Sequence, residues 1–404
     1  MRRIGRARAA GIALASFALA ACGSGLGASA PKTWVPKPSF QGEGQAPAIS
    51  PAVPAPGQNT PSAPSTGGPT PSAAPTTQVD PNGVATKLTT PDAIAVLPDN
   101  TALVGERTTG RIVRVQSQPG QPVTTVRTLS GLDTTDGGGL LDLALSPNYS
   151  EDNLIFALIT TPTDLRVVDF TLTGQVTPVF TGIPHGTAGA RGRIVFGADQ
   201  RLYIGTPDTA SPASAADPAS LAGKVLRVTD IGAPAPGNPA GSPVFTSGHR
   251  FVAGLCTTVA PTAPVLFDVE PNAGGQGEVN QLKAGATYGW PVRGAASSAA
   301  AGLLPVGQTS VGGCAVIGTT LYVTSRDKQD VLSAPITIKG STVSIGTYTT
   351  LLPRKYGRLD TIVAAADGAL WITTSNKDGH GQPIADDERV IRIVPGGAES
   401  KSPV

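Results

Sequence analysis

From residue 93 onward, short apolar runs alternate with turns rich in glycine, proline and aspartate. These units occupy residues 93–115, 141–170, 193–209, 314–327 and 361–376, with a last run at 389–394. Runs of Val, Ile and Leu bounded by such turns predict β-strands. No amphipathic stretch of about 10–15 residues alternates with them, which argues against α/β folds. The pattern therefore predicts an all-β fold.

A single unit of this kind cannot bury both faces of its strands, so we expect the units to stack around an axis. Residues 84–395 comprise 312 residues. Six blades would take about 52 residues each, close to the roughly 50 of kelch-type blades. The sequence predicts a six-bladed β-propeller over 84–395 and a flexible tail over 396–404.

The N-terminus has the features of a targeting segment. Four arginines in the first eight residues precede an apolar run over 9–21. About 13 helical residues span about 20 Å, less than the roughly 30 Å of a bilayer core, which indicates a signal sequence rather than a transmembrane helix. The run ends in Leu-Ala-Ala-Cys at Cys22, which is similar to a bacterial lipobox. We expect residues 1–21 to be a lipoprotein signal peptide and Cys22 to be acylated; the alternative is an ordinary secretory signal with an accidental cysteine.

Residues 22–83 are dominated by Pro, Ala, Ser, Thr and Gly. Such a segment buries too little apolar surface to offset its ordering entropy, so we expect a disordered linker. Two acyl chains on Cys22 suffice for stable anchoring. The prediction is an extracytoplasmic domain, monomeric and lipid-anchored to the cell membrane.

The formal net charge is +2 and charged residues make up 14% of the chain. This balance provides no basic stripe for a nucleic acid. We therefore expect partners of another kind, namely the membrane through the lipid anchor and a glycan or an envelope protein as ligand.

Two cysteines remain once Cys22 is assigned to the anchor, Cys256 and Cys314. An exported protein resides in an oxidising compartment, where a disulfide persists. We predict a bond between them; the alternative is two small buried apolar residues.

The repeated units resemble the glucose/sorbosone dehydrogenase family of six-bladed propellers, which use pyrroloquinoline quinone (PQQ) and calcium. The resemblance rests on segments such as ALVGERTTGRIVRV, GGGLLDLALSPNYSEDNLIF, GHRFVAG, GEVNQLKAGATYGWP and YGRLDTIVAAADGALWITTSNKDGHG. They follow the family's order through the whole predicted propeller. Within the family, SPNYS, TPTD and ADPASLAGKVLR are similar to actinobacterial LppZ-type lipoproteins.

The resemblance also implies where the chemistry has changed. In active members a histidine removes a proton from the sugar, and the matching position here is Gly189. Glycine cannot accept a proton. His185, four residues earlier, could act as a substitute base only in a rebuilt loop; otherwise it is a solvated loop histidine.

Four further polar positions of the family are altered. Gly137 replaces a sugar-contacting Gln or Glu, Phe251 an asparagine and Gly277 an acidic residue. Asp360 replaces the second of two arginines that hold the quinone, so repulsion replaces attraction toward an anionic cofactor. The resemblance therefore argues against PQQ binding.

Other family positions are retained. Arg250 and Arg358 could line an anionic pocket in the central channel, or be structural arginines bonded to loop carbonyls. Glu278 and Tyr288 stand ten residues apart, as in the family's calcium segment. They could bind calcium, or form a Glu salt bridge and a Tyr packed on Trp290.

Two further patterns are expected to be structural. The acidic residues within 378–388 lack the spacing of an EF-hand and predict a solvated loop. The chain has only three histidines, none close to another in sequence. A histidine metal site is therefore unexpected, and packing is the expected role of His249.

The sequence leaves two functions open, one a binding or scaffold role and the other an enzymatic one. The first is a surface lipoprotein whose propeller binds a ligand or acts as a scaffold after losing its redox site. The alternative is an active PQQ- and calcium-dependent sugar or alcohol dehydrogenase with a rearranged site.

Overall fold

The computed structural model describes residues 80–186, 191–258, 264–271, 276–291, 304–307 (backbone only) and 310–396. The predicted signal peptide, Cys22, Gly189 and residues 397–404 lie outside them, as does the linker up to residue 79. By its internal contacts the chain divides into residues 1–72 and 73–404, and every described residue belongs to the second unit. None of the helices in the described part is both long and apolar enough to cross a bilayer.

The first three blades are four-stranded antiparallel sheets built from consecutive strands. Blade 1 comprises β2 (Pro91–Val96), β3 (Ala102–Glu106), β4 (Arg111–Val115) and β5 (Thr124–Thr128). Blade 2 comprises β6 (Leu140–Leu145), β7 (Ile155–Thr160), β8 (Leu165–Phe170) and β9 (Thr177–Ile183). Blade 3 comprises β10 (Arg193–Phe196), β11 (Leu202–Gly205), β12 (Lys224–Val228) and β13 (Val244–Ser247).

Blade 4 has the same arrangement, whereas blades 5 and 6 differ in their outer strands. Blade 4 comprises β14 (Gly254–Thr257), β15 (Leu266–Pro271), β16 (Gly277–Gln281) and β17 (Leu304–Gly307). Blade 5 comprises β18 (Val311–Ile317), β19 (Thr320–Ser325), β20 (Asp330–Lys339), β21 (Thr342–Ile345) and β22 (Thr349–Leu351). Blade 6 comprises β23 (Leu359–Ala364), β24 (Leu370–Thr374), β25 (Val390–Ile393) and, on its outer edge, β1 (Gly83–Ala85).

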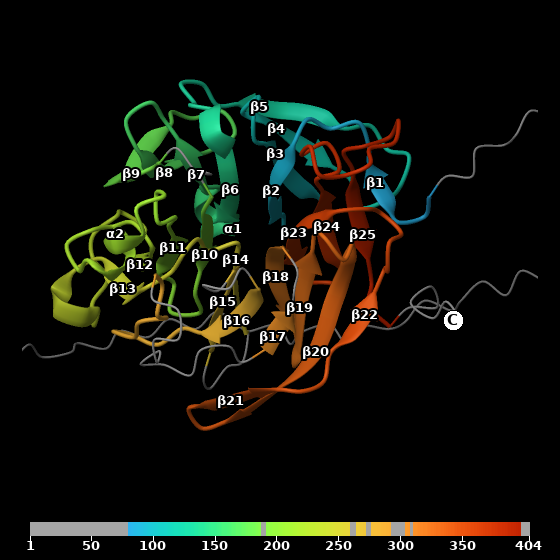
Figure 1. Cartoon of the computed structure of the whole chain (residues 1–404). Coiled ribbons are helices and arrows are strands. Elements are labelled where there is room, and N and C mark those ends of the chain that lie inside the picture. The colour runs from blue at the N-terminus through green and yellow to red at the C-terminus, as the bar shows by residue number, and fades with distance from the viewer. Residues whose placement is uncertain are drawn as a thin grey trace, which may run out of the picture. The chain divides into compact units, whose positions relative to one another are not determined.

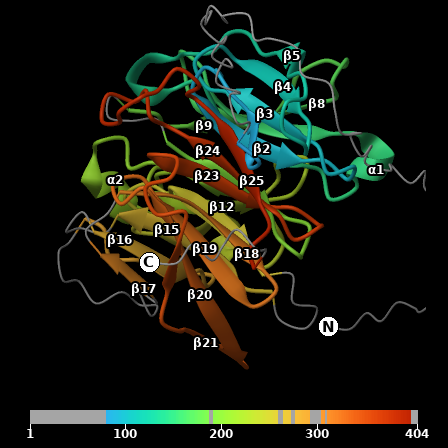
Figure 2. The same ribbon diagram turned by 90° about the vertical axis from the view of Figure 1, so that its right-hand side faces the viewer.

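The six sheets form a closed ring, which confirms the predicted six-bladed propeller (Figures 1 and 2). The innermost strands contact one another in the order β2, β6, β10, β14, β18 and β23, and β23 returns to β2. The ring is closed by β1, which pairs with β25 through Gly83–Ile391 and Ala85–Val390. The start of the described chain thus completes the last blade.

Apolar side chains fill the spaces between blades, because strands covered on both faces need apolar residues at successive positions. Every residue of β7 is buried. The inner strands also approach closely: a Cβ placed on Gly254 would lie 2.7 Å from the backbone nitrogen of Cys314. Four short helical turns lie in connecting loops: η1 (Thr135–Gly137), α1 (Tyr149–Asp152), α2 (Pro212–Ala216) and η2 (Pro239–Gly241).

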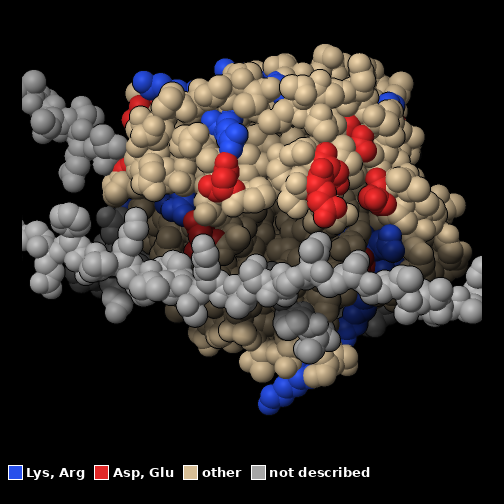
Figure 3. Space-filling view, turned by 180° about the vertical axis from the view of Figure 1, so that it is seen from behind, with Lys and Arg blue, Asp and Glu red and all other residues tan. Residues whose placement is uncertain are grey.

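The predicted disulfide is confirmed, since Cys256 on β14 and Cys314 on β18 are bonded with a Cα–Cα distance of 5.7 Å. It joins the inner strands of blades 4 and 5. On the face seen in Figure 3, charged side chains form small separate groups within a mostly uncharged surface.

Candidate functional site

The main polar cavity of the described residues lies where the inner strands begin. Its volume is about 510 Å³. Inner strands start at the same end of the channel, so the loops that precede them converge there. The charged residues and the histidine in its lining are Asp92, Arg107, Arg191, Arg326, Arg358, Asp360, Lys377, Asp378, His380 and Glu388.

Asp360 and Arg326 form a buried ion pair at the base of this cavity. Arg326 Nη2 lies 2.5 Å and Nε 3.1 Å from Asp360 Oδ1, and Arg326 Nη1 donates to Val311 O at 2.7 Å. Burial opposes ionisation of Asp360, but Arg326, Arg193 and Arg191 outweigh it and hold the pKa of this carboxyl well below its usual range. Asp360 therefore does not present the free repelling charge that the sequence predicted. Its main effect is to occupy Arg326.

Arg358 lines the cavity but is bound by carboxylates of the same chain. Its Nε donates to Asp378 Oδ2 at 2.9 Å and its Nη1 to Asp327 Oδ1 at 2.7 Å. The backbone N–H of Arg358 donates to Asn376 Oδ1 at 2.7 Å. The guanidinium is thus held by carboxylates rather than by the loop carbonyls of the structural alternative.

Arg193 closes the channel beneath the cavity. Its guanidinium donates to the carbonyls of Ala253 at 2.8 Å and Leu141 at 2.7 Å, and it lies 3.4 Å from Asp92 Oδ1. It also lies 3.8 Å from Asp360 Oδ1. These partners come from several blades, so one buried side chain ties the inner ring together at the axis.

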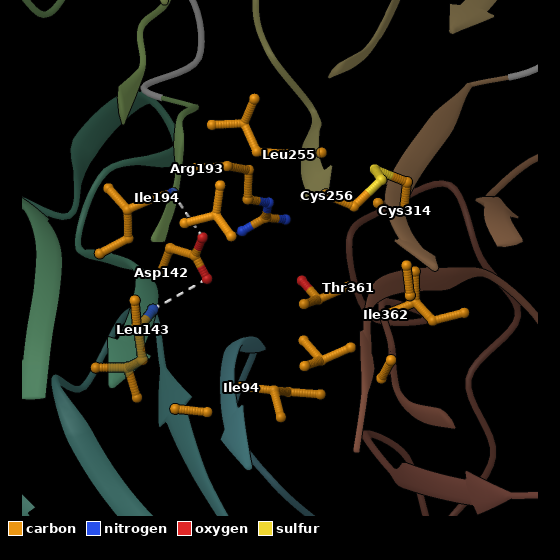
Figure 4. Close-up of a pocket in the computed structure, with 18 of the residues that line it drawn as sticks. Ile94, Asp142, Leu143, Arg193, Ile194, Leu255, Cys256, Cys314, Thr361 and Ile362 are labelled. Carbon is orange, nitrogen blue, oxygen red and sulfur yellow. Dashed lines mark hydrogen bonds between the residues drawn. A yellow bond between two sulfur atoms is a disulfide. The ribbon is translucent and has the colours of Figure 1, made fainter. Parts of the chain in front are cut away.

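Beyond Arg193 the channel becomes apolar and has a volume of about 360 Å³ (Figure 4). Asp142 points into this end and accepts the backbone N–H groups of Leu143 at 3.0 Å and Ile194 at 2.9 Å. Burial raises the pKa of Asp142 to about 6, against the opposing effect of Arg193. The disulfide lines the same end of the channel.

Arg191 is a cation of the cavity that no carboxylate of the described residues holds. Among the described residues it makes no hydrogen bond or ion pair, and its guanidinium lies 5.9 Å from the centre of the Phe251 ring. Repulsion from Arg326, together with burial, lowers the pKa of Arg191 to about 10, although Asp360 and Asp92 partly compensate. The sequence analysis did not single out Arg191, although it lies two residues after Gly189, the position that the resemblance assigns to the base.

The histidine that lines the cavity is His380, not His185, which the sequence analysis considered as a substitute base. His380 lines the cavity, and its backbone N–H donates to Asp378 Oδ1 at 2.9 Å. His185 is half-buried after β9 and is not among the lining residues. Gly189, the position of the family's base, lies outside the described residues.

Arg250 does not line this cavity with Arg358. Its guanidinium lies 5.0 Å from the centre of the Trp290 ring, and its backbone N–H donates to Glu270 Oε2 at 2.9 Å. The indole N–H of Trp290 donates to Asp208 Oδ2 at 2.8 Å. The structure therefore separates the two arginines that the sequence grouped.

Tyr288 packs on His249, and Glu278 lies opposite Glu270 in the β15–β16 register. The Tyr288 hydroxyl donates to Gln281 O at 2.5 Å and accepts the N–H of Lys283 at 3.1 Å. The Tyr288 ring stacks on the imidazole of His249, with ring centres 4.8 Å apart, rather than on Trp290. The side chain of Tyr288 is thus engaged, and a calcium ligand from this residue would be its backbone carbonyl.

The acidic loop is not simply solvated, contrary to the sequence-based expectation. Asp387 and Glu388 are each 1% exposed. Glu388 accepts the hydroxyl of Thr374 at 2.6 Å and the N–H of Asn376 at 2.9 Å. Backbone N–H groups near the cavity therefore use this carboxylate as an internal acceptor.

Comparison with protein families supports the observed architecture. A family model described as "Glucose / Sorbosone dehydrogenase" matches residues 88–310. The chain is 28% identical over 235 residues to quinoprotein glucose dehydrogenase B of Acinetobacter calcoaceticus, covering 48% of each protein. It is 28% identical over 227 residues to the aldose sugar dehydrogenase YliI of Escherichia coli, covering 50% of the chain and 58% of that protein. The chain thus spans about half the length of the curated relatives it matches.

Solved structures show the same fold. The PQQ-bound form of aldose sugar dehydrogenase from Streptomyces coelicolor matches with a TM-score of 0.71 and 34% identity, over 78% of this chain and 97% of that one. A structure from Thermus thermophilus, described as a "putative oxidoreductase (glucose dehydrogenase)", matches with a TM-score of 0.70 and 34% identity, over 78% and 99% of the two chains.

Proposed function

Because the chain belongs to the glucose/sorbosone dehydrogenase family, we propose that it uses the family's propeller to bind a small sugar-like ligand without oxidising it. The observation that carries this proposal is the engagement of two cavity arginines, Arg326 and Arg358, by carboxylates of the same chain. Arg326 is bound by Asp360, and Arg358 by Asp327 and Asp378. A quinone with several carboxylates needs these guanidinium groups, and bidentate arginine contacts are the usual means of binding it. The residues present do not fit such a cofactor.

The same cavity fits a ligand of low charge. Arg107 lies 3.2 Å from Asp92, and Lys377 donates to the carbonyl of Asp387. Arg191 is left as the cation without an internal partner among the described residues. We propose a neutral sugar or a sugar with a single acidic group, whose carboxylate would contact Arg191 and whose hydroxyls would meet the surrounding carboxylates.

We propose that the protein acts at the cell envelope. The support is the lipobox-like sequence that ends at Cys22 and the similarity of segments such as SPNYS to actinobacterial LppZ-type lipoproteins. A diacylated Cys22 would anchor the propeller by two chains, and the linker would set its distance from the membrane.

A specific observation also favours the alternative, an active PQQ- and calcium-dependent dehydrogenase with a rearranged site. The chain is 34% identical to a structure solved with PQQ bound, and His380 in the cavity lining supplies an imidazole. In that case the cofactor would have to displace Asp378 or Asp327 from Arg358.

A PQQ titration with a released arginine distinguishes these functions. We expect no saturable PQQ binding by the unmodified protein at concentrations on the order of micromolar. The double variant Asp327→Asn with Asp378→Asn frees Arg358 and should bind PQQ about tenfold more tightly or better, as a charge-assisted hydrogen bond contributes roughly 1.5–3 kcal/mol. Binding is followed by PQQ absorbance in the presence of calcium.

The matched control is Asp367→Asn, which removes the exposed partner of Arg392 on β25, outside the cavity lining. It should leave PQQ binding unchanged. Tight PQQ binding by the unmodified protein, with no gain in the double variant, would contradict the proposal.

A further inference from the structure

A second cluster of ionisable side chains lies away from the polar cavity, at the junction of blades 3 and 4. His249 follows β13, whereas Asp268 and Glu270 lie on β15. Alternate residues of a strand point to the same face, so the two carboxylates face His249 together. The three residues are 0%, 0% and 2% exposed. The cluster is therefore entirely enclosed.

The imidazole is held in one orientation. Its Nε2 lies 2.8 Å from Thr246 Oγ1, and its ring stacks on Tyr288. The other nitrogen, Nδ1, points at the carboxylates, 2.8 Å from Glu270 Oε1 and 3.2 Å from Asp268 Oδ2. The three potential ligand atoms lie within 4.8 Å of one another.

Asp268 has the weakest contacts in this cluster, because its one ion-pair partner among the described residues is His249, at 3.2 Å. Both of its carboxylate oxygens are buried and have no hydrogen-bond partner among the described residues. His249 Nδ1 carries at most one proton, and Glu270 lies closer to it. A buried carboxylate without donors costs several kcal/mol unless a charge or a metal compensates for it.

Nearby charges make this deficit larger. Glu278 lies opposite Glu270 in the β15–β16 register, and Asn280 Nδ2 lies 3.3 Å from a carboxylate oxygen of each. Within the described part of the chain, the ion pairs of Asp268 and Glu270 are with His249 alone. The imidazole of His249 thus faces two buried carboxylates, those of Asp268 and Glu270.

We propose that His249, Asp268 and Glu270 bind a divalent transition metal, with Zn²⁺ as the first candidate. An imidazole nitrogen with carboxylate oxygens is a ligand set that suits zinc, whereas calcium prefers oxygen alone. Zinc bonds of about 2.0–2.2 Å place ligand atoms roughly 3–4 Å apart, which these three atoms reach by small side-chain movements. Thr246 Oγ1 on Nε2 is the outer contact that such a histidine needs. The ion replaces the proton on Nδ1, which is released to solvent.

This site differs from the calcium pair expected from the sequence. Glu278 and Tyr288 are not among its three ligands, and Tyr288 acts by packing on the imidazole. The proposed ion would hold the β13–β14 connection against β15. It would lie next to the hydrogen bond that the backbone N–H of Arg250 donates to Glu270.

Metal content and metal-dependent stability test the proposal on the full chain. After treatment with a chelator, Zn²⁺ should bind at one equivalent per chain in a calorimetric titration and raise the melting temperature. Co²⁺ should give visible absorption bands of a site with nitrogen and oxygen ligands. Asp268→Asn keeps the side-chain size and should weaken Zn²⁺ binding by at least about 100-fold, while the metal-free variant melts no lower than the metal-free original.

The matched control is Asp330→Asn, because Asp330 on β20 also has a buried oxygen without a hydrogen-bond partner in the described structure. It should leave the zinc stoichiometry unchanged. The proposal is overturned if no transition metal binds stoichiometrically, if only calcium binds, or if Asp268→Asn binds zinc as well as the original. If Asp268→Asn does not fold, the Co²⁺ spectrum of the unmodified protein decides.

Discussion

At the residue scale, the buried charges along the channel axis are arranged to neutralise one another. Arg326 with Asp360 and Arg193 with Asp92 are buried or nearly so. Removing one partner of such a pair leaves an uncompensated charge and destabilises by about 3–5 kcal/mol. These residues therefore constrain both the stability of the ring and the ligands that the cavity accepts. Asp142 is the exception, because burial outweighs its contact with Arg193.

Asp142 predicts a specific pH dependence. Its pKa is raised from 3.8 to about 6, so between these values the native protein keeps a proton that the unfolded chain has lost. The native state then binds more protons, and stability falls as the pH rises through this window, by about 3 kcal/mol in total. The Asp142→Asn variant has no carboxyl to titrate at this position, so its unfolding free energy should lack this decline. We expect the difference in unfolding free energy between the two proteins to change by this amount between about pH 4 and pH 7. Parallel curves across that range would contradict the assignment.

At the scale of elements, five of the six inner strands overlap predicted apolar runs, but β14 lies outside them. The lateral contacts of the strands could not be predicted. The last apolar run, 389–394, corresponds to β25 (Val390–Ile393). By contrast, β1 has three residues and too little pattern to be found, and its partner β25 lies about 300 residues away. The ion pairs of Arg358 likewise join loops 20 and 31 residues apart, a distance over which sequence spacing carries no geometric information. Arg250 and Arg358 were grouped because the resemblance groups them, whereas packing on Trp290 holds Arg250 elsewhere.

The disulfide between β14 and β18 should be a major source of stability at this scale. It closes a segment with a sequence separation of 58 residues, for which the chain-entropy model gives about 4 kcal/mol. We expect the double variant Cys256→Ala with Cys314→Ala to lose about this much unfolding free energy in denaturant titrations. Reduction of the unmodified protein should have a similar effect. A loss of less than about 1 kcal/mol would show that the bond constrains the unfolded chain very little.

At the scale of the molecule, the propeller provides a closed ring with one polar and one apolar end of its channel. The ring and its blade number were predictable because strand patterning and turn residues are local properties. The polar character of one channel end and the apolar character of the other could not be predicted. They depend on which side chains six separate strands bring to one axis. His380 belongs to this class, because the sequence analysis found nothing that places it in the cavity lining, whereas Arg191 lies two residues after Gly189, the position of the family's base.

The proposed membrane anchor is tested on the whole protein in cells. Cys22→Ala should leave the precursor unprocessed or release the protein from the membrane fraction, because the acylated residue is removed. Fractionation and intact mass measure both outcomes. A variant that stays in the membrane fraction with the mass of the unmodified protein would contradict the anchor.

The central claim is that this propeller binds its ligand without redox chemistry, and sugar-dependent dye reduction tests it most directly. The purified full chain is incubated with PQQ and calcium, and an electron-accepting dye is followed with a panel of aldoses, beside the E. coli aldose sugar dehydrogenase YliI as a positive control. With Arg326 engaged by Asp360 and Arg358 by Asp327 and Asp378, the account predicts no sugar-dependent reduction above the PQQ-free rate. Sustained reduction that depends on both PQQ and an aldose would contradict it, and His380 would then be the first residue to replace.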